Sequence, residues 1–341
     1  MGFTVRIKGH DAPVTVEMGR SILDSAIDQG GPFPYSCRAG NCGTCKCRLL
    51  SGEIEMSPFS EFALSAEEQE KGFILACRAV PWSDCEIELA GEDDLVVHPM
   101  RDMRAELVGL SELTHDIRRL ELAIIEGGPF IFSAGQYAEL SLGTVPARSW
   151  SMASLPDAAH LVFYVRLVPG GQASRYIAQS LEIGDIVRVR GPFGSAYLRE
   201  GRRAPLIAIA GGSGLAPIRA IVDRALALGW SENIHVYFGV RDERDLFDLD
   251  HFEELAARHA NLRFEAVLSD PSGPTARRTG FVTDAVRADF PTLEGHVAYL
   301  AGPPPMIEAA ERLLVRLGIE ARDIHADAFY TEAEKAKGES S

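Results

Sequence analysis

Four of the six cysteines in this chain have a spacing that can hold an iron–sulfur cluster. Cys37, Cys42 and Cys45 form a C-x4-C-x2-C pattern, and Cys77 follows at a distance. This spacing is typical of [2Fe-2S] sites, in which four thiolates surround two irons. We expect the first three thiolates on one tight loop and the fourth on a later strand. The pattern therefore predicts a one-electron carrier.

The loop between the first three cysteines has the small residues that such a site needs. Gly40, Gly43 and Thr44 let backbone N–H groups turn inward toward the cluster. A zinc site is the alternative. Zinc ribbons pair two short C-x2-C knuckles, whereas only Cys42 and Cys45 form one here. The spacing favours the cluster.

The two remaining cysteines fall outside the pattern. Cys47 stands two residues after the ligand Cys45 and could share its side of a strand, whereas Cys85 lies well beyond the fourth ligand. We interpret both as buried thiols without a ligand role.

Composition and charge narrow the class of protein. A chain of 341 residues with 46% hydrophobic and 24% charged residues is expected to form two or three globular domains. The chain opens directly on an alternating strand pattern, and no apolar run could span a bilayer, so we expect a cytoplasmic protein with reduced cysteines.

The net charge of −15 disfavours nucleic acid and anionic membranes as partners. Residues 1–98 hold 8 Lys and Arg against 16 Asp and Glu. This acidic region could be steered toward a positive surface on an electron acceptor, or it could merely keep the protein soluble.

The first region has the pattern of a small sheet around the cysteine loop. We expect strands at residues 3–7, 14–17, 73–80 and 85–90, a helix at 21–29 that Ser21 caps, and a helical turn at 65–72. An acidic run and a His-Pro step at residues 91–103 then break the periodicity, which indicates a linker.

The second region predicts an antiparallel barrel of short strands. The expected strands are residues 104–110, 117–124, 136–142, 161–167 and 185–191. Between the third and the fourth of these strands, Arg148 could hold a phosphate, Trp150 could stack on a ring, and Ser151 offers a hydroxyl. The glycines before Ser174 predict a helix that begins there, and such a helix N-terminus can bind a pyrophosphate. A surface strand with satisfied polar groups would look the same.

The third region changes to the alternating strand and helix pattern of a parallel α/β domain. Strands are expected at residues 204–210, 234–240, 263–269 and 297–302, with helices between them. Gly211, Gly212 and Gly214 follow the first of these strands, where nucleotide phosphates bind. The run lacks the Lys of a P-loop, so kinase and ATPase chemistry is not expected.

Taken in order, the motifs resemble one family over nearly the whole chain. The cysteine pattern, RSWS, GGQAS, GGSGLAP and AGPPPMIEAA follow one another as in the reductase components of bacterial multicomponent oxygenases. That resemblance implies a β-grasp plant-type ferredoxin fused to an antiparallel flavin-binding β-barrel and a parallel α/β nucleotide-binding domain. The boundaries implied are a ferredoxin domain at 1–92, a linker at 93–103, the barrel at 104–201, the nucleotide domain at 202–330 and a flexible tail at 331–341.

The resemblance also implies the cofactor sites. The cluster ligands would be the four cysteines of the pattern. The flavin site would comprise Arg148, Ser149, Trp150, Ser151, Val165, Arg166, Leu167, Gly171, Gln172, Ala173 and Ser174. The pyridine-nucleotide site would comprise Gly211, Gly212, Ser213, Gly214, Pro217, Gly302, Pro303 and Pro304. Ser151 would face the flavin N5, and Phe329 resembles a C-terminal aromatic that covers the flavin, so these two are the expected catalytic residues.

Two positions depart from the family pattern. Trp150 stands where Tyr is usual, and Ala301 stands where the family commonly has Cys beside the nicotinamide. We expect both departures to permit binding and to affect the hydride-transfer rate and the redox tuning.

The resemblance implies an NADH-dependent enzyme that contains FAD and one [2Fe-2S] cluster. NADH gives two electrons as hydride, whereas the cluster accepts one at a time, so the flavin must divide the pair. The acceptor would be a terminal oxygenase of aromatic-compound degradation or a separate ferredoxin, and the protein would be a monomer. Two alternatives stay open. The same chemistry could serve a deoxysugar dehydrase or a hydrocarbon monooxygenase, or the chain could be a carrier whose reductase module is inactive.

Overall fold

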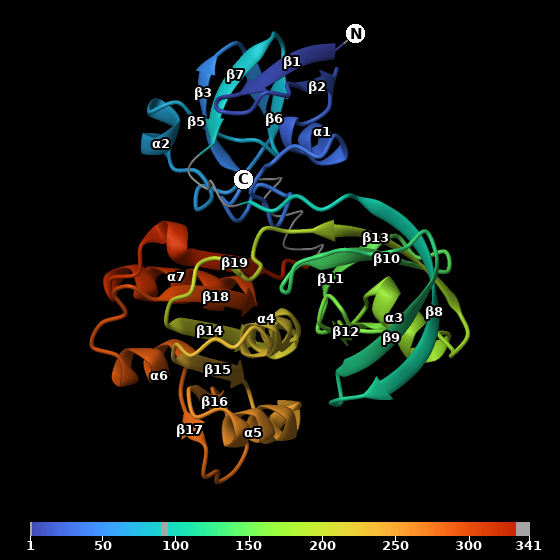
Figure 1. Cartoon of the computed structure of the whole chain (residues 1–341), viewed down its shortest axis with the longest axis vertical. Helices are drawn as coiled ribbons and strands as arrows, with labels where there is room; N and C mark the ends of the chain where they lie inside the picture. The colour runs from blue at the N-terminus through green and yellow to red at the C-terminus, as the bar shows by residue number, and fades with distance from the viewer. Residues whose placement is uncertain (1, 90–94, 332–341) are drawn as a thin grey trace. The chain divides into compact units, whose positions relative to one another are not determined.

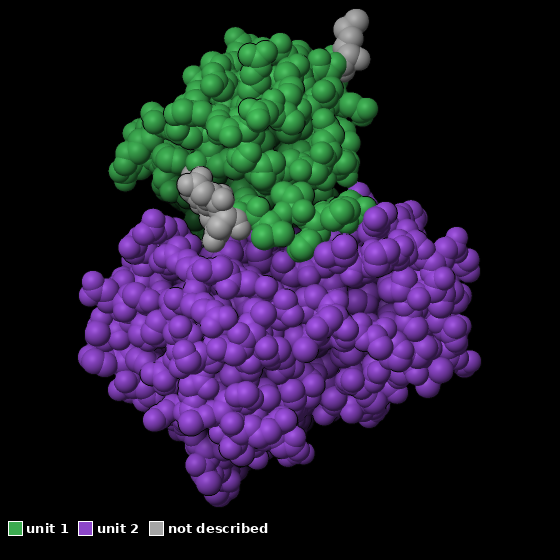
Figure 2. Space-filling model, viewed as in Figure 1, with its two compact units in different colours: residues 1–100, 328–341 green, residues 101–327 purple. Residues whose placement is uncertain are grey.

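The structure, a computed structural model, describes residues 2–89 and 95–331, so the first two residues of the predicted linker and most of the predicted tail lie outside the described residues. The chain forms two units, which Figure 2 distinguishes by colour. Unit 1 contains Met1–Met100 and Ala328–Ser341, and unit 2 contains Arg101–Asp327. The last described residues, 328–331, thus group with the N-terminal region.

Unit 1 is a mixed five-stranded sheet with two short helices and a small two-stranded sheet. Its elements are β1 (Gly2–Ile7), β2 (Val14–Glu17), α1 (Ile22–Asp28), β3 (Lys46–Ser51), β4 (Ile54–Met56), α2 (Ala66–Glu70), β5 (Phe73–Leu75), β6 (Ala79–Pro81) and β7 (Cys85–Leu89). The larger sheet has the order β2-β1-β7-β3-β5, with β1 antiparallel to β2 and parallel to β7. Alternation in β1 buries Val5 and Ile7, which fixes the register against its neighbours.

Helix α1 covers this sheet through one apolar stripe. The Ser21 hydroxyl accepts a hydrogen bond from the Asp24 N–H at 3.1 Å and caps the first turn, as predicted. Ile22, Leu23 and Ala26 are fully buried. The helix therefore stays in place through packing as well as through its cap.

Unit 2 begins with an antiparallel barrel. Its elements are β8 (Arg101–Glu112), β9 (Ile117–Glu126), β10 (Tyr137–Leu142), β11 (Arg148–Ser151), β12 (Leu161–Arg166), α3 (Gln172–Gln179) and β13 (Ile186–Phe193). The strand order is β11-β10-β13-β8-β9-β12. A bridge between Met152 and Phe163, with the Ala153 N–H donating to the Val162 carbonyl at 2.7 Å, nearly closes the barrel between its end strands. The predicted antiparallel barrel is confirmed.

The rest of unit 2 is a parallel sheet covered by helices, which occupies the yellow-to-red part of Figure 1. Its elements are β14 (Leu206–Gly211), η1 (Gly212–Gly214), α4 (Leu215–Ala227), β15 (Ile234–Val240), η2 (Glu243–Asp245), α5 (Leu249–Arg258), β16 (Leu262–Leu268), β17 (Arg278–Thr279), α6 (Val282–Asp289), β18 (Val297–Gly302), α7 (Pro304–Arg316), η3 (Ala321–Asp323) and β19 (Ile324–Ala328). The order is β17-β16-β15-β14-β18-β19. Strand β14 lies in the middle and is buried along its whole length. The carboxyl ends of β14, β15, β16 and β18 therefore meet at one edge of the sheet.

Three local predictions differ from the structure. Residues 73–80 form two short strands rather than one, and Cys77 lies in the turn between them. Helix α3 begins at Gln172 rather than at Ser174, because Gly171 already serves as its N-cap. Strand β8 begins at Arg101, inside the segment predicted as linker. Within the described ranges, every helix is too short or too polar to cross a bilayer.

Candidate functional site

The cysteine loop of unit 1 is shaped by two glycines in the left-handed region. Gly40 has φ +75° and Gly43 has φ +73°. A Cβ on Gly43 would lie 2.9 Å from the Ala63 carbonyl oxygen, and a Cβ on Gly40 would lie 2.7 Å from the Arg78 Nε. Glycine is therefore required at both positions by conformation and by space, as the sequence predicted.

The four predicted ligands pair two and two. The Cys42 thiol hydrogen bonds to the Cys37 sulfur and, with backbone N–H groups, lowers the pKa of Cys37 to about 6. The Cys45 thiol similarly hydrogen bonds to Cys77, which together with burial raises the pKa of Cys45. The Ala39 N–H donates to the Cys37 sulfur at 3.4 Å. Backbone donors at a sulfur stabilise a thiolate, which is the form that binds iron.

This pairing is the one that two irons with two thiolates each would use. Among the described residues, no three His, Cys, Asp or Glu side chains gather where they could hold a single metal ion. A [2Fe-2S] cluster separates its four thiolates over two irons, so pairs suffice. In addition, the buried Asn41 side-chain nitrogen in the loop has no hydrogen-bond partner within the described chain, which is consistent with a loop built around a further group.

Two other features of unit 1 bear on the cluster loop. Cys47 and Cys85 are buried, and burial raises the pKa of both thiols, that of Cys47 to about 12.

The cysteine loop is held by hydrogen bonds from residues outside it. The Arg78 guanidinium donates to the Ala39 carbonyl at 2.6 Å, and the Ser60 N–H donates to the Gly40 carbonyl at 3.0 Å. The ligands thus lie on a braced loop.

The predicted flavin residues lie on the barrel in two groups. The first group is strand β11, in which Trp150 is half-buried against the barrel core and Ser151 is buried. The Ser151 hydroxyl donates to the Asp327 carboxylate on β19 at 2.9 Å. Sequence reasoning missed Asp327, although a buried acid in the alternating run of residues 324–328 was a signal that could have found it.

The second group lies at the end of β12 and the start of α3. Val165 is buried, and the Ser174 hydroxyl accepts the Val168 N–H at 2.8 Å. No side chain caps α3, so its first N–H groups can receive an anion. Gln172 and Ala173 form the first turn of this helix. The arrangement suits a phosphate group.

The predicted nucleotide residues form the edge where β14 and β18 end. A Cβ on Gly214 would lie 2.1 Å from the Ala301 carbonyl oxygen, and a Cβ on Gly302 would lie 3.0 Å from Gly211. These glycines allow the two strand ends and the start of α4 to approach closely. Pro303 and Pro304 then open α7.

A cavity of about 210 Å³ lies at this edge. It brings the predicted residues Arg166, Gly211, Gly212 and Pro303 together. Its other lining residues are Asp116, Ile117, Gly239, Val240, Arg241, Asp245, Val267, Ser269, Gly280, Phe281, Val282 and Met306. The predicted flavin residue Arg166 thus contributes to the nucleotide cavity.

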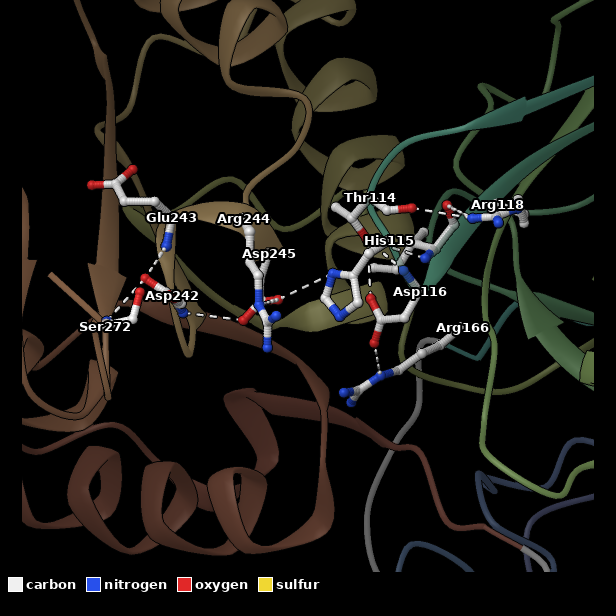
Figure 3. Close-up of polar contacts among 11 residues, drawn as sticks. Thr114, His115, Asp116, Arg118, Arg166, Asp242, Glu243, Arg244, Asp245 and Ser272 are labelled. Carbon is white, nitrogen blue, oxygen red and sulfur yellow. Dashed lines mark hydrogen bonds and ion pairs between the residues drawn. The ribbon is translucent and has the colours of Figure 1, made fainter.

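Figure 3 shows the polar contacts beside this cavity. Arg166 donates to Asp116 at 2.9 Å, and His115 lies 3.6 Å from Asp245. Asp242 accepts a hydrogen bond from the Ser272 hydroxyl at 2.6 Å, which lowers the pKa of Asp242. Carboxylates as well as arginines therefore lie in and beside the cavity.

Comparison with known proteins identifies three domains in the chain. Residues 5–81 match the 2Fe-2S iron-sulfur cluster binding domain, residues 104–197 the oxidoreductase FAD-binding domain, and residues 208–312 the oxidoreductase NAD-binding domain. The chain is 43% identical over 320 residues to a Ralstonia reductase component of naphthalene 1,2-dioxygenase/salicylate 5-hydroxylase systems, with 93% of this chain and 95% of that protein covered. The chain belongs to the reductase components of multicomponent oxygenases.

Other reductases also match over nearly the whole chain. A Pseudomonas putida reductase component of the naphthalene 1,2-dioxygenase system is 37% identical, covering 95% of this chain and 98% of the relative. The crystal structure of an Amycolatopsis cytochrome P450 reductase matches with a TM-score of 0.81 and 39% identity, covering 96% of this chain and 98% of that one. As a family member, the protein is an oxidoreductase with a [2Fe-2S] ferredoxin domain and with FAD- and NAD-binding domains.

Proposed function

We propose that this protein takes electrons from NADH and passes them through FAD and the [2Fe-2S] cluster to an oxygenase of aromatic-compound degradation, directly or through a separate ferredoxin. One observation carries the proposal: the full-length likeness to the Ralstonia and Pseudomonas reductase components. Reconstitution tests it. The protein with NADH should support turnover by a naphthalene-type oxygenase, and failure with every oxygenase and ferredoxin tried, despite bound cofactors, would refute it.

The proposed roles follow from position. Bound FAD would accept a hydride and release single electrons. Trp150 offers a stacking plane, Arg148 a cation for phosphate, and the start of α3 backbone N–H groups for the pyrophosphate. The Ser151 hydroxyl, held by Asp327, would be oriented toward the reacting ring atom. The expectation that Phe329 covers the flavin also remains a proposal.

The nucleotide site would bind its ligand at the carboxyl edge of the sheet. The close-packed glycines leave the backbone of 211–214 open to a pyrophosphate at the start of α4, which no side chain caps. The nicotinamide would lie near Gly302, where Ala301 is buried and supplies no thiol. The proposed domain boundaries are those expected from the sequence, except that the barrel begins at Arg101 rather than at residue 104.

The rim of the cavity supports NADH over NADPH. Asp242 follows β15, where an acidic residue can bind the ribose 2′-hydroxyl, and Asp245 lines the cavity. Both carboxylates would repel a 2′-phosphate, although Arg241 also lines the cavity. The ratio of kcat/KM values should favour NADH, and Asp245→Asn should narrow it. A higher kcat/KM for NADPH in the unmodified protein would contradict this choice.

An acidic surface beside the cluster loop supports docking of a basic redox partner. Residues 53–70 contain six Glu and neither Lys nor Arg. This acidic segment borders the loop, because Ser60 bonds to Gly40, and it exposes 46% of Phe62. Phe62→Ser should weaken electron transfer to the partner, and transfer should slow as salt rises. Exposed Ile183→Ser in unit 2, away from the cavity, is the matched control, and equal effects of both variants would contradict the proposal.

We further propose that the protein acts as a cytoplasmic monomer. All six cysteines are free thiols in the structure, as expected in a reducing compartment. Light scattering of the holoprotein tests the monomer, and a dimer mass would contradict it.

A further inference from the structure

The C-terminal segment of the chain reaches the cysteine loop within unit 1. The Tyr330 hydroxyl donates a hydrogen bond to the Asn41 carbonyl at 3.0 Å, although 289 positions separate the two residues. Both belong to unit 1. Asn41 is 5% exposed and stands directly before the ligand Cys42. A residue far outside the first region of the sequence thus contacts the loop that carries three of the four ligands.

The hydrogen bond from Tyr330 to Asn41 lies next to N–H groups that donate to the sulfur of Cys37. The Asn41 N–H donates to the Cys37 sulfur at 3.4 Å. The next N–H, that of Cys42, also hydrogen bonds to this sulfur. The carbonyl that accepts from Tyr330 belongs to the same peptide group as the Cys42 N–H. A hydrogen bond at the carbonyl strengthens donation by the N–H of the same peptide.

A second side chain also bonds to a carbonyl of the loop. Ala39 donates its N–H to the Cys37 sulfur at 3.4 Å, and its carbonyl accepts from the Arg78 guanidinium at 2.6 Å. Ala39 and Asn41, whose N–H groups lie 3.4 Å from the Cys37 sulfur, thus each have their carbonyl held by a side chain. One of these side chains belongs to Arg78, which follows the ligand Cys77, and the other belongs to Tyr330.

We propose that Tyr330 is a positioning residue for the cluster, which holds the N–H donors of Asn41 and Cys42 on the Cys37 sulfur and so raises the reduction potential of the cluster. The inference rests on the proposed [2Fe-2S] site. Reduction adds negative charge to the cluster, and N–H donors at a ligand sulfur stabilise that charge. The sequence gives no sign of this role, because Tyr330 lies outside every motif.

Redox titration of the full-length holoprotein tests the proposal. Tyr330→Phe keeps the ring and removes only the hydroxyl. The cluster of the variant should have a more negative midpoint potential, by up to about tenfold in the one-electron equilibrium, or about 59 mV. Its EPR spectrum in the reduced state should also shift, while iron, sulfide and flavin contents stay at wild-type values.

Tyr237→Phe is the matched control, because the Tyr237 hydroxyl bonds to Asp289 at 2.7 Å within the nucleotide region of unit 2. It should leave the cluster potential unchanged. An unchanged potential and EPR spectrum in Tyr330→Phe would overturn the inference and leave the cluster site standing. Absence of a cluster in the unmodified protein would instead refute the site itself. If Tyr330→Phe loses iron, Tyr330→His, which retains a donor, should restore the cluster, and failure to do so would also overturn the inference.

Discussion

Gly214→Ala is the sharpest test of the nucleotide site, because the added methyl group would meet the closest backbone contact there. Gly214 has φ −61°, so alanine fits its backbone conformation and only the added methyl group matters. That methyl carbon would lie 2.1 Å from the oxygen and 2.4 Å from the carbon of the Ala301 carbonyl, and 2.9 Å from the Gly302 nitrogen. All three atoms are backbone, so no side chain can rotate away. Either the start of α4 or the end of β18 must move by about 1 Å to reach ordinary contact distances.

The expected cost follows from that displacement. Overpacking of this kind costs about 1–3 kcal/mol, which for a region of this size lowers Tm by roughly 2–12 °C. A misplacement of about 1 Å can slow a reaction about 100-fold, so we expect a large loss in the rate of flavin reduction by NADH. Thermal unfolding and stopped-flow absorbance at the flavin band measure the two effects.

Gly201→Ala is the control for this variant. No atom lies within 4 Å of the position of its Cβ, and its φ is ordinary, so both Tm and rate should stay at wild-type values. If Gly214→Ala matches the wild type in Tm and in flavin reduction, the strand ends do not form the nucleotide site as described.

Three further predictions concern routing, shielding and pH. Cys42→Ala should destroy the cluster and stop reduction of a one-electron protein acceptor, while NADH oxidation by ferricyanide persists through the flavin; joint loss of both activities would contradict the proposed route. Phe329→Ala should speed the reaction of reduced protein with oxygen at unchanged Tm if Phe329 shields the flavin, whereas a lower Tm with unchanged oxygen consumption would show that it only anchors the chain end. Burial lowers the pKa of His325 from 6.5 to about 3, so the unfolded chain binds an extra proton between these values. The free energy of unfolding should therefore decrease as the pH is lowered through this window, by up to about 1.4 kcal/mol per pH unit. Denaturant titrations should show a shallower dependence for His325→Phe, and an equal dependence would refute the assignment.

Local patterns predicted the architecture because each one has a direct physical cause. The spacing of Cys37, Cys42, Cys45 and Cys77 fixed the kind of metal site, and the alternating strands of the second region indicated the barrel. Ser21 was found as a cap because its hydroxyl acts within three residues. Such signals lie within one segment, so a single sequence contains them.

Contacts between distant segments could not be predicted in the same way. Asp327 meets Ser151 across 176 positions, and Tyr330 meets Asn41 across 289. Neither pair has a motif, because the partners are brought together only by sheet order and by the path of the chain end. The Cys77 turn was missed for a different reason: an apolar run of eight residues looks like one strand, and only the packing of β5 and β6 into different sheets divides it.

Anaerobic titration of the purified protein with NADH, followed by visible absorbance and EPR, tests the central claim most directly. Our account predicts one FAD and two irons per chain, bleaching of the flavin and cluster bands together, and a reduced [2Fe-2S] signal in the final state. A cluster spectrum that stays oxidised while NADH reduces the flavin, or a preparation that contains zinc or lacks flavin, would contradict it.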